Sequence, residues 1–187
     1  MAHRRRLFNE DDMQLLTERL ILTKLVVEDW AIFRDVHCDD ISMRYISAVL
    51  QIDEIKQRFS DRLAPWQVTS YHMLCLVIRL KESGTPIGLM GANAEWEPYR
   101  QAEVGYSLLS HYCGNGYGSE ALAAICHFLF QCDFHKLKAS VVEGNWASRK
   151  TLEKNGFILE GTLRDNYRLR DQWVNDWVFG KLAHQNN

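Results

Sequence analysis

Apolar residues recur along this chain at two spacings, and each spacing predicts a different kind of element. Nearly continuous apolar runs, such as MLCLVI at residues 73–78, are typical of buried strands. Apolar residues three or four positions apart, such as Ile55, Phe59 and Leu63, are typical of one face of a helix. The pattern predicts strands at residues 19–25, 72–80, 86–96, 103–109, 136–142, 157–167 and 172–182. It predicts one helix that starts at residues 28–29, and three more at residues 52–63, 116–130 and 146–154.

Glycine, proline and polar residues separate these segments. The turn at residues 82–86 joins two strands into a hairpin, and a turn at Arg170–Asp171 joins the last two strands. Asn155–Gly156 ends the last helix, because glycine readily adopts the left-handed conformation of a helix cap. Neither an internal repeat nor a linker interrupts the pattern. The sequence therefore predicts one domain of the α+β class over residues 1–187, with residues 1–16 as an N-terminal arm.

The composition is that of a globular domain without a strong charge bias. Of 187 residues, 47% are hydrophobic, and 22 lysines and arginines stand against 24 aspartates and glutamates, for a formal net charge of -2. This balance argues against broad nucleic-acid binding, which needs a concentrated basic face. The basic run at residues 3–6 is followed at once by Glu10, Asp11 and Asp12, so we expect a solvated terminus there.

No segment predicts a membrane-bound or secreted protein. No apolar run approaches the roughly 18 residues of a membrane span, and polar residues 9–14 stand where a signal peptide needs its apolar core. The cysteines lack C-x-x-C spacing and the histidines form no H-x-x-x-H pair, so neither a disulfide framework nor a metal site is predicted. We expect a soluble cytoplasmic protein that binds no metal, nucleic acid or membrane.

A glycine-rich loop at residues 112–121, YCGNGYGSEA, is the strongest candidate for a ligand site. It follows a predicted strand and opens a predicted helix, where unpaired backbone N–H groups and the helix dipole attract anions. Such a loop can hold a pyrophosphate, since glycines allow close approach and positive φ. No lysine follows the glycines as in a Walker loop, and the late position differs from that of a dinucleotide fingerprint. An empty glycine-rich turn is the alternative.

The loop and the segments behind it resemble the GNAT N-acetyltransferase superfamily. The loop pattern of that family, (Q/R)-x-x-G-x-(G/A), aligns with Cys113, Gly116 and Gly118, and two of its three defined positions match. NWAS at residues 145–148 and EKNGF at residues 153–157 continue the resemblance. Position, context and pattern together point to a coenzyme A site.

Two further segments indicate a subgroup of the family. TERLIL at residues 17–22 and EVGY at residues 103–106 look like the ribosomal-protein alanine and serine N-acetyltransferases, the Rim type. The matching segments extend from Thr17 to about Trp177. The resemblance implies a mixed, mostly antiparallel sheet of six or seven strands, about four flanking helices, and acetyl-CoA held between two strands that splay apart.

The resemblance also implies contacts for particular residues. The splayed strands would be residues 103–109 and 136–142, and Asn145, just past the second strand, would help to fix the cofactor arm. The pantetheine would meet the backbone of Ser107, Leu108 and Leu109. The pyrophosphate would meet the loop at Gly114, Asn115, Gly116, Tyr117, Gly118 and Ser119.

The reaction that the resemblance implies is direct attack of an amine on the thioester. An α-amine has a pKa of about 7.7–8, so it must lose a proton before it attacks. Glu103, on the strand that leads to the cofactor, and Glu160, at the start of the last strand pair, are the candidate bases. Either could instead be a surface carboxylate or a salt-bridge partner. A backbone N–H near Leu108 is the expected donor to the oxyanion.

The leaving thiolate benefits from a proton donor. Many family members have a tyrosine seven residues after the asparagine, but this chain has Leu152 there. The Rim type has a serine three residues after it, which makes Ser148 the candidate donor; a first-turn serine could instead satisfy a backbone N–H. Cys113 precedes a helix, where thiolates are stabilised. Only His111 is close to it in sequence, so covalent catalysis is disfavoured.

Together these features predict an acetyl-CoA-dependent N-acetyltransferase whose acceptor is a primary amine, such as the N-terminus of a ribosomal protein. Two alternatives stay open: acetylation of a polyamine, amino acid or antibiotic amine, and a module that binds acetyl-CoA without turnover. The helices within residues 28–64 and the final hairpin are expected to form the acceptor pocket. A monomer or a homodimer is expected, since the long final strands could pair with a second copy.

Overall fold

The computed structural model describes residues 13–186, and its centre is one eight-stranded sheet. The strand order is β1-β2-β3-β4-β5-β6-β8-β7; β5 and β6 are parallel, and all other neighbours are antiparallel. The strands are β1 Gln14–Leu16, β2 Leu20–Lys24, β3 Leu74–Leu80, β4 Pro86–Glu95, β5 Gln101–Leu108, β6 Lys136–Val142, β7 Ile158–Leu169 and β8 Gln172–Leu182. The α-helices are α1 Trp30–Cys38, α2 Asp40–Met43, α3 Ile52–Leu63, α4 Tyr117–Gln131 and α5 Trp146–Lys154.

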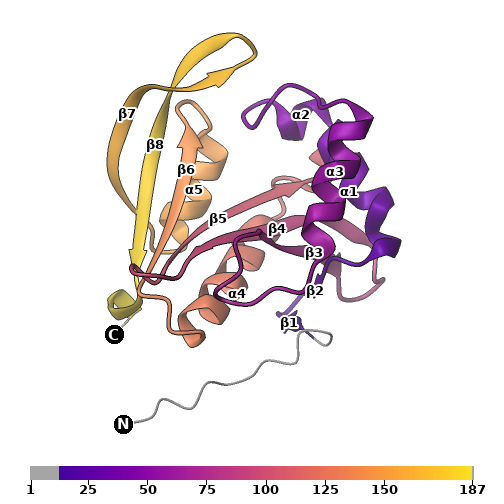
Figure 1. Ribbon diagram of the computed structural model, residues 1–187, viewed down its shortest axis with the longest axis horizontal. Coiled ribbons are helices and arrows are strands. Elements are labelled where there is room, and N and C mark those ends of the chain that lie inside the picture. Colours follow the sequence, from indigo (N-terminus) through magenta and orange to yellow (C-terminus); the bar gives the residue numbers. More distant parts are fainter. Residues whose placement is uncertain (1–12, 187) are drawn as a thin grey trace.

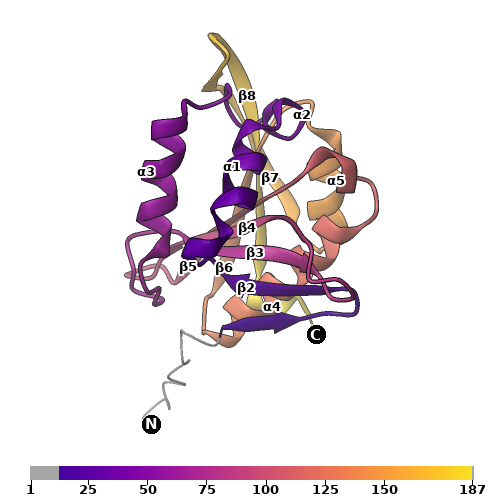
Figure 2. The same ribbon diagram turned by 90° about the vertical axis from the view of Figure 1, so that its right-hand side faces the viewer.

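Helices cover both faces of the sheet, with α1 and α3 on one face and α4 and α5 on the other (Figures 1 and 2). On α4 the stripe of Ala121, Ile125 and Leu129 is fully buried against the sheet, as its helical spacing predicts. On the opposite face, Phe33 of α1 and Phe59 of α3 pack edge to face with ring centroids 5.2 Å apart. The sheet therefore has a hydrophobic cluster on each side.

The strand β3 lies between these two clusters, which explains its unbroken apolar sequence. Leu74, Leu76 and Ile78 belong to the cluster on the α4 side. Cys75 and Val77 belong to the cluster on the α1 and α3 side. Successive side chains of a strand point to opposite faces, so a strand covered by helices on both faces is apolar at every position.

The predicted α+β fold is confirmed, and the bounds of α3, β6, α5 and β8 are those that the sequence pattern predicts. The pattern misses β1 and α2, because three or four residues are too few to show a period. β1 lies within the predicted N-terminal arm, so the sheet has eight strands instead of six or seven. Residues 1–12 of that arm lie outside the described residues. Among the helices that are described, none combines the length and apolar character needed to cross a membrane.

Candidate active site

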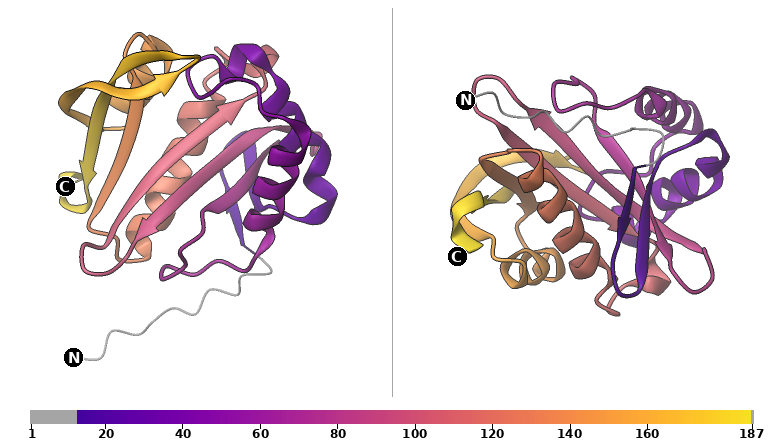
Figure 3. Two further views of the ribbon diagram at one scale, coloured as in Figure 1. Left: turned by 45° about the horizontal axis from the view of Figure 1, so that its top comes forward. Right: turned by 90° about the horizontal axis from the view of Figure 1, so that it is seen from below.

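The parallel strands β5 and β6 diverge in the middle of the sheet (Figure 3). They pair only where Gln101–Glu103 faces Lys136–Lys138. Beyond this point β5 remains paired with β4, and β6 remains paired with β8 along its whole length. A Cβ atom added to Gly105 would meet nothing within 4 Å, so the face of the sheet above this part of β5 is open. The predicted splay is therefore present.

The glycine loop, defined here as residues 114–119, joins the end of this region to α4. Gly114 and Gly116 have φ of +82° and +81°, a left-handed conformation that glycine adopts without strain. Gly116 is the N-cap of α4 and offers no side chain to the helix start. Among the described residues, no acceptor binds the backbone N–H groups from Gly114 to Ser119. Consecutive free N–H groups at a helix N-terminus fit a pyrophosphate, so the predicted loop has the right geometry for coenzyme A.

The last two residues of the glycine loop also have partners within the protein. A Cβ atom at Gly118 would lie 3.1 Å from the Tyr106 ring, so this glycine lets α4 pack closely against β5. The Ser119 hydroxyl oxygen accepts a hydrogen bond of 2.9 Å from Asn155 Nδ2, which ties the start of α4 to the end of α5. Their backbone N–H groups are left for a ligand.

Arg19, which the sequence did not single out as a site residue, supports the glycine loop from the side. Its Nε donates to Glu120 Oε2 at 2.7 Å and its Nη1 donates to the Asn115 carbonyl at 3.1 Å. The guanidinium also lies 4.7 Å from the centroid of the Tyr117 ring. Only the fold brings Arg19 beside Glu120, and the ion pair of the two side chains fixes the guanidinium against the edge of the loop.

Glu120 keeps its negative charge at the start of α4 because several donors converge on it. Burial acts to raise the pKa of this carboxyl, but hydrogen bonds from Thr17 and Arg19 outweigh that effect and lower the pKa. The Thr17 hydroxyl donates to Oε1 at 2.6 Å, and the backbone N–H of Arg19 donates to the same oxygen at 2.8 Å. A carboxylate in the first turn of a helix is also favoured by the helix dipole.

Asn145 has a structural role at the start of α5. Its Oδ1 accepts a hydrogen bond of 3.3 Å from the Ser148 backbone N–H, which makes it the N-cap of the helix. This oxygen is therefore used within the protein, and the amide nitrogen of Asn145 is the side-chain atom left for the predicted contact with the cofactor. By ending the loop after β6 in this way, Asn145 also determines where Ser148 lies.

Ser148 lies opposite a residue that the sequence did not indicate as functional, Tyr106 of β5. The two hydroxyl oxygens are 3.4 Å apart, a long hydrogen bond. Burial raises the pKa of the Tyr106 phenol, although hydrogen bonds with Ser148 and Thr151 act in the opposite direction. Tyr106 therefore stays protonated at neutral pH. The sequence EVGY predicted only that Tyr106 lies in a strand, because its contact with α5 exists only in the tertiary structure.

The three residues predicted to meet the pantetheine differ in which of their hydrogen-bonding groups lack a partner within the protein. The hydroxyl of Ser107 is buried and has no hydrogen-bond partner among the described residues. The Leu108 carbonyl accepts from the Ser42 hydroxyl. The backbone of Leu109 is engaged on both sides, since its N–H donates to the Ile87 carbonyl at 3.0 Å and its carbonyl accepts from the Tyr112 N–H at 2.9 Å. The N–H of Leu109 is therefore not free for the pantetheine, and its predicted contact stays a prediction for the carbonyl alone.

The two candidate bases, Glu103 and Glu160, come together in one hollow. This acceptor hollow has a volume of about 230 Å³ and lies where β5 and β6 begin to diverge. It is lined by Glu103, Lys138, Ala139, Ser140, Glu160, Val178 and Phe179. The two alternative candidates thus line the same hollow although they are far apart in the sequence.

The surroundings of the two carboxylates differ. Glu160 Oε2 is 2.7 Å from Lys136 Nζ, and Lys138 Nζ is likewise 2.7 Å from Glu95 Oε2. Glu103 has no ion pair among the described residues. The carboxylate of Glu160 is thus occupied by an ion pair, whereas that of Glu103 is left open to a hydrogen bond from a ligand.

Glu160 reaches the hollow because β7 bulges at this point. Leu159 pairs with Phe179 and Gly161 with Val178, which leaves Glu160 as an extra residue. Gly180 of β8 lies beneath its carboxylate, and a Cβ atom there would overlap the Glu160 side chain. The ion pair with Lys136 therefore depends on a glycine in the facing strand.

The surroundings of Cys113 disfavour it as a nucleophile. Burial and the nearby charge of Asp39 raise the pKa of the Cys113 thiol, the opposite of what a thiolate nucleophile needs. The His111 ring packs on Tyr112, with centroids 4.2 Å apart. No group of His, Cys, Asp and Glu side chains within residues 13–186 could hold a metal ion.

The tip of the final hairpin contacts the segment around α2, and Figure 1 shows the two near each other at the top of the view. Tyr167 of β7 donates its hydroxyl proton to the Ile46 carbonyl, and Arg170 in the hairpin turn forms an ion pair with Asp40. These contacts join the two parts of the chain that were predicted to form the acceptor pocket.

Comparison with known proteins agrees with this geometry. The family model of the acetyltransferase (GNAT) domain matches residues 19–158. An uncharacterized N-acetyltransferase, p20 of Bacillus licheniformis, is 27% identical over 177 residues, which cover 91% of this chain and 97% of the relative. The uncharacterized N-acetyltransferase YoaA of Bacillus subtilis is 28% identical over 80% of this chain and 85% of its own.

Solved structures share the fold at low sequence identity. A GNAT-family acetyltransferase from Bacillus anthracis superposes with a TM-score of 0.80 at 20% identity, over 92% of this chain and all (100%) of that one. RimL, a ribosomal L7/L12 α-N-protein acetyltransferase bound to coenzyme A, has a TM-score of 0.80 at 16% identity, over 91% and 98% of the two chains. The spermidine N-acetyltransferase of Vibrio cholerae, with coenzyme A and spermine, has a TM-score of 0.77 at 17% identity, over 89% and 97%.

Proposed function

Because the chain belongs to the GNAT acetyltransferase family and is an acetyl-CoA-dependent N-acetyltransferase, we propose that its acceptor is the N-terminal amine of a protein. The observation that carries this proposal is the balance of charge at the acceptor hollow. Lys136 and Lys138 pair with Glu160 and Glu95, which leaves the single carboxylate of Glu103 unpaired among the described residues. One free carboxylate matches one ammonium group, as at the end of a polypeptide chain.

A polyamine acceptor is less well served by this hollow. Such a molecule carries several positive charges, whereas Glu103 is the one carboxylate of the hollow without an ion pair among the described residues. Fold likeness does not choose between the acceptors, since the solved structures named above include both a protein and a spermidine acetyltransferase with similar TM-scores. The charge pattern of this chain supports the singly charged acceptor.

In the proposed mechanism one set of groups binds the cofactor and another set moves protons. Acetyl-CoA supplies an acetyl group that is activated as a thioester. The N–H groups of the glycine loop hold the pyrophosphate, and Arg19 supports the loop through its hydrogen bond to the Asn115 carbonyl. Glu103 accepts the proton of the attacking amine, directly or through water. As the amine nitrogen bonds to the acetyl carbon and the carbon–sulfur bond breaks, the Ser148 hydroxyl passes its proton to the sulfur and takes one from the Tyr106 hydroxyl, which water reprotonates.

The proposal is tested with a panel of acceptors that differ in charge and in chain end. The panel holds lysine-free hexapeptides that begin with alanine or serine, the same peptides with an acetylated N-terminus, and spermidine; thiol release from acetyl-CoA is measured. We expect turnover with the free peptides, none with the blocked ones, and a lower kcat/KM with spermidine. Preference for spermidine would refute the proposed acceptor, and coenzyme A binding without turnover of any amine would favour a binding module.

A further inference from the structure

Two carboxylates are buried in the described part of the chain, and they differ in how their charge is balanced. Asp29, 5% exposed, forms an ion pair with Arg79. Asp176 of β8, 6% exposed, has no ion pair among the described residues. A buried aspartate is rarely found without a partner, because the loss of hydration then goes uncompensated. The charge of Asp176 is therefore left for a group from outside the described chain.

Asn166 of β7 orients the Asp176 carboxylate. Its Nδ2 donates a hydrogen bond of 2.9 Å to Oδ2, and no described residue donates to the other oxygen, Oδ1. In the described part of the chain, the fully buried side-chain atoms without a hydrogen bond belong to Trp66, His72 and Ser107. Since Asp176 is not among them, its Oδ1 keeps some contact with solvent. One carboxylate oxygen is thus fixed by the protein, and the other is left for a ligand.

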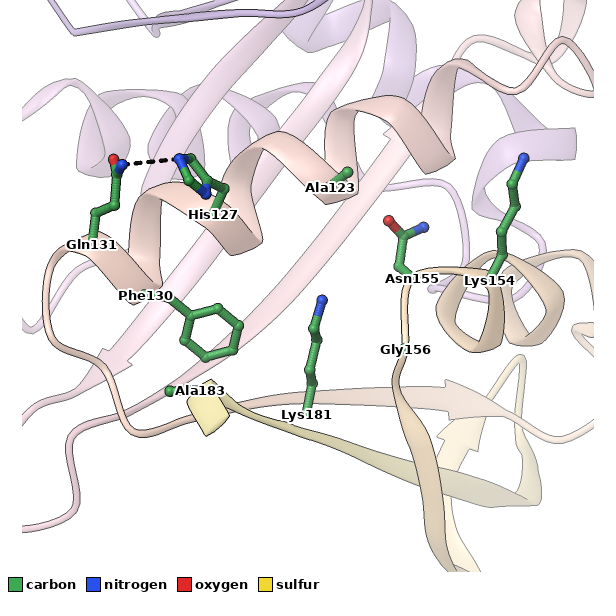
Figure 4. A pocket seen from close by; sticks show the side chains of 9 residues that line it. All are labelled: Ala123, His127, Phe130, Gln131, Lys154, Asn155, Gly156, Lys181 and Ala183. Carbon is green, nitrogen blue, oxygen red and sulfur yellow. Dashed lines mark hydrogen bonds between the residues drawn. The ribbon is translucent and has the colours of Figure 1, made fainter. Parts of the chain in front are cut away.

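Asp176 points to the face of the sheet opposite α4 and α5. Side chains alternate along a strand, and β8 pairs with β6 without a shift in register. Lys181 of β8 points toward α4 (Figure 4), and Trp177 and Phe179 belong to the hydrophobic cluster on that side. Asp176 has the other parity, so its carboxylate lies on the α1 and α3 side of the sheet.

The register of the strands places Asp176 beside the gap between β5 and β6. Asp176 pairs with Val142 of β6, four residues beyond Lys138. Lys138 pairs with Glu103, the proposed base, at the start of the gap. Four residues correspond to roughly 13 Å along a strand. Ser107 is likewise four residues beyond Glu103 on β5, so Asp176 and Ser107 stand equally far along the gap, on opposite sides of it.

The β5 side of the gap offers a path from the base toward Asp176. The residues of β5 that point to the α1 and α3 side are Glu103, Gly105 and Ser107, since the intervening Val104 belongs to the cluster on the α4 side. Gly105 has no side chain, and the Ser107 hydroxyl has no hydrogen-bond partner among the described residues. An acceptor whose amine meets Glu103 can therefore extend over Gly105 to the level of Asp176.

We propose that Asp176 binds a basic side chain at the second or third residue of the acceptor, an inference that rests on the proposed acceptor being a protein N-terminus. The amine at Glu103 cannot also meet Asp176, because the two carboxylates stand roughly 13 Å apart along the strands. An extended chain advances about 3.4 Å per residue, and a long arginine or lysine side chain covers the rest of the distance. Its cationic group then donates a charge-assisted hydrogen bond to Oδ1 of Asp176.

Acceptor peptides that differ in a single charge test the proposal. Lysine-free hexapeptides that begin with alanine carry either arginine or citrulline, its neutral isostere, at the second or at the third residue; spermidine is the comparison amine. Thiol release gives kcat and KM for the wild type, Asp176→Asn and Glu143→Gln. Glu143 is the matched control, since its carboxylate also accepts one asparagine amide, from Asn175 at 2.7 Å, but is exposed.

We expect the wild type to have a KM about tenfold lower for the arginine peptide than for its citrulline counterpart at one of the two positions, because a hydrogen bond between charged groups is lost with citrulline. Asp176→Asn should abolish this difference with little change in kcat, and Glu143→Gln should keep it. Asn166→Ala changes an exposed residue and leaves Asp176 in place but unoriented, so the difference should shrink about threefold even if Asp176→Asn does not fold.

The outcomes separate this inference from the proposed function. Turnover of the peptides with equal KM for arginine and citrulline in the wild type would overturn the role of Asp176 and leave the protein acceptor standing. An equal rise in KM for all peptides in Asp176→Asn would also overturn it. Turnover of no peptide, or a loss in Asp176→Asn that is confined to spermidine, would refute both the inference and the proposed acceptor.

Discussion

The phenol oxygen of Tyr106 lies 3.4 Å from the hydroxyl oxygen of Ser148, so that β5 and the first turn of α5 each contribute a hydroxyl to the same place. Leu152, at the position where many relatives have a tyrosine, is 1% exposed and belongs to the core. A phenol is therefore supplied by the strand instead of the helix. The Tyr106 ring cannot move toward α4 without meeting Gly118.

We expect Ser148→Ala to lower kcat by about 10²-fold and Tyr106→Phe by about tenfold, because a positioned proton donor contributes roughly 10²–10⁴-fold and the tyrosine acts behind the serine. The double variant should be little worse than Ser148→Ala, since the two groups act as one unit. Steady-state thiol release at saturating acetyl-CoA measures this. Tyr112→Phe, whose ring packs on His111, is the matched control and should be neutral. Fully multiplicative losses would contradict the shared role.

Glu103→Gln should lower kcat/KM by about 10²-fold at pH 7, because the amide cannot accept the proton of the acceptor amine. The deficit should shrink toward pH 9, where an α-amine of pKa about 7.7–8 is already neutral. Glu160→Gln should cost less than about tenfold, since that carboxylate is paired with Lys136. A pH–rate profile of both variants measures the difference. Equal losses at every pH would argue against Glu103 as the base.

Glu120→Gln should destabilise the fold in a pH-dependent way. Thr17 and Arg19 lower the pKa of this carboxyl despite its burial, so the folded pKa lies below the unfolded value. Its stabilisation is therefore fully present above the unfolded pKa of about 4.3 and is lost as pH falls through the folded pKa. Urea unfolding should show a loss of about 1–2 kcal/mol at pH 7 and a much smaller one near pH 3. A difference that is constant with pH would contradict the assignment.

Gly180→Ala should displace the ion pair of Glu160 and Lys136 without unfolding the protein. The new Cβ atom would overlap the Glu160 carboxylate and lie 2.8 Å from Lys136 Cε, and both side chains can swing aside. Gly161→Ala is the control, because its Cβ atom would meet only Val178 Cγ2 at 3.7 Å. We expect unchanged unfolding for both variants, within about 1 kcal/mol. The change in kcat/KM for Gly180→Ala then measures the contribution of Glu160 to the reaction. If Gly180→Ala and Gly161→Ala have the same kcat/KM, Glu160 makes no contribution.

The regular elements follow from local patterns, and the sequence therefore predicts most of them. The helical spacing of Ile55, Phe59 and Leu63 places α3, and the unbroken run of β3 predicts a strand buried on both faces. β1 and α2 are not predicted, because elements of three or four residues carry no period and β1 exists only through its pairing with β2. The glycine loop is predicted for the same local reason, since its glycines and the following helix are adjacent in the chain.

The catalytic environment is a different matter, because it depends on residues that are distant in the sequence. By itself the sequence determined the α+β fold, the glycine loop and a short set of candidate groups, including Glu103, Ser148 and Glu160. Only the tertiary structure decided that Lys136 neutralises Glu160, that Arg19 supports the loop, and that Tyr106 lies behind Ser148. The physical reason is that charge pairing and proton transfer depend on distances of a few ångströms, which long-range packing determines and local periodicity does not encode.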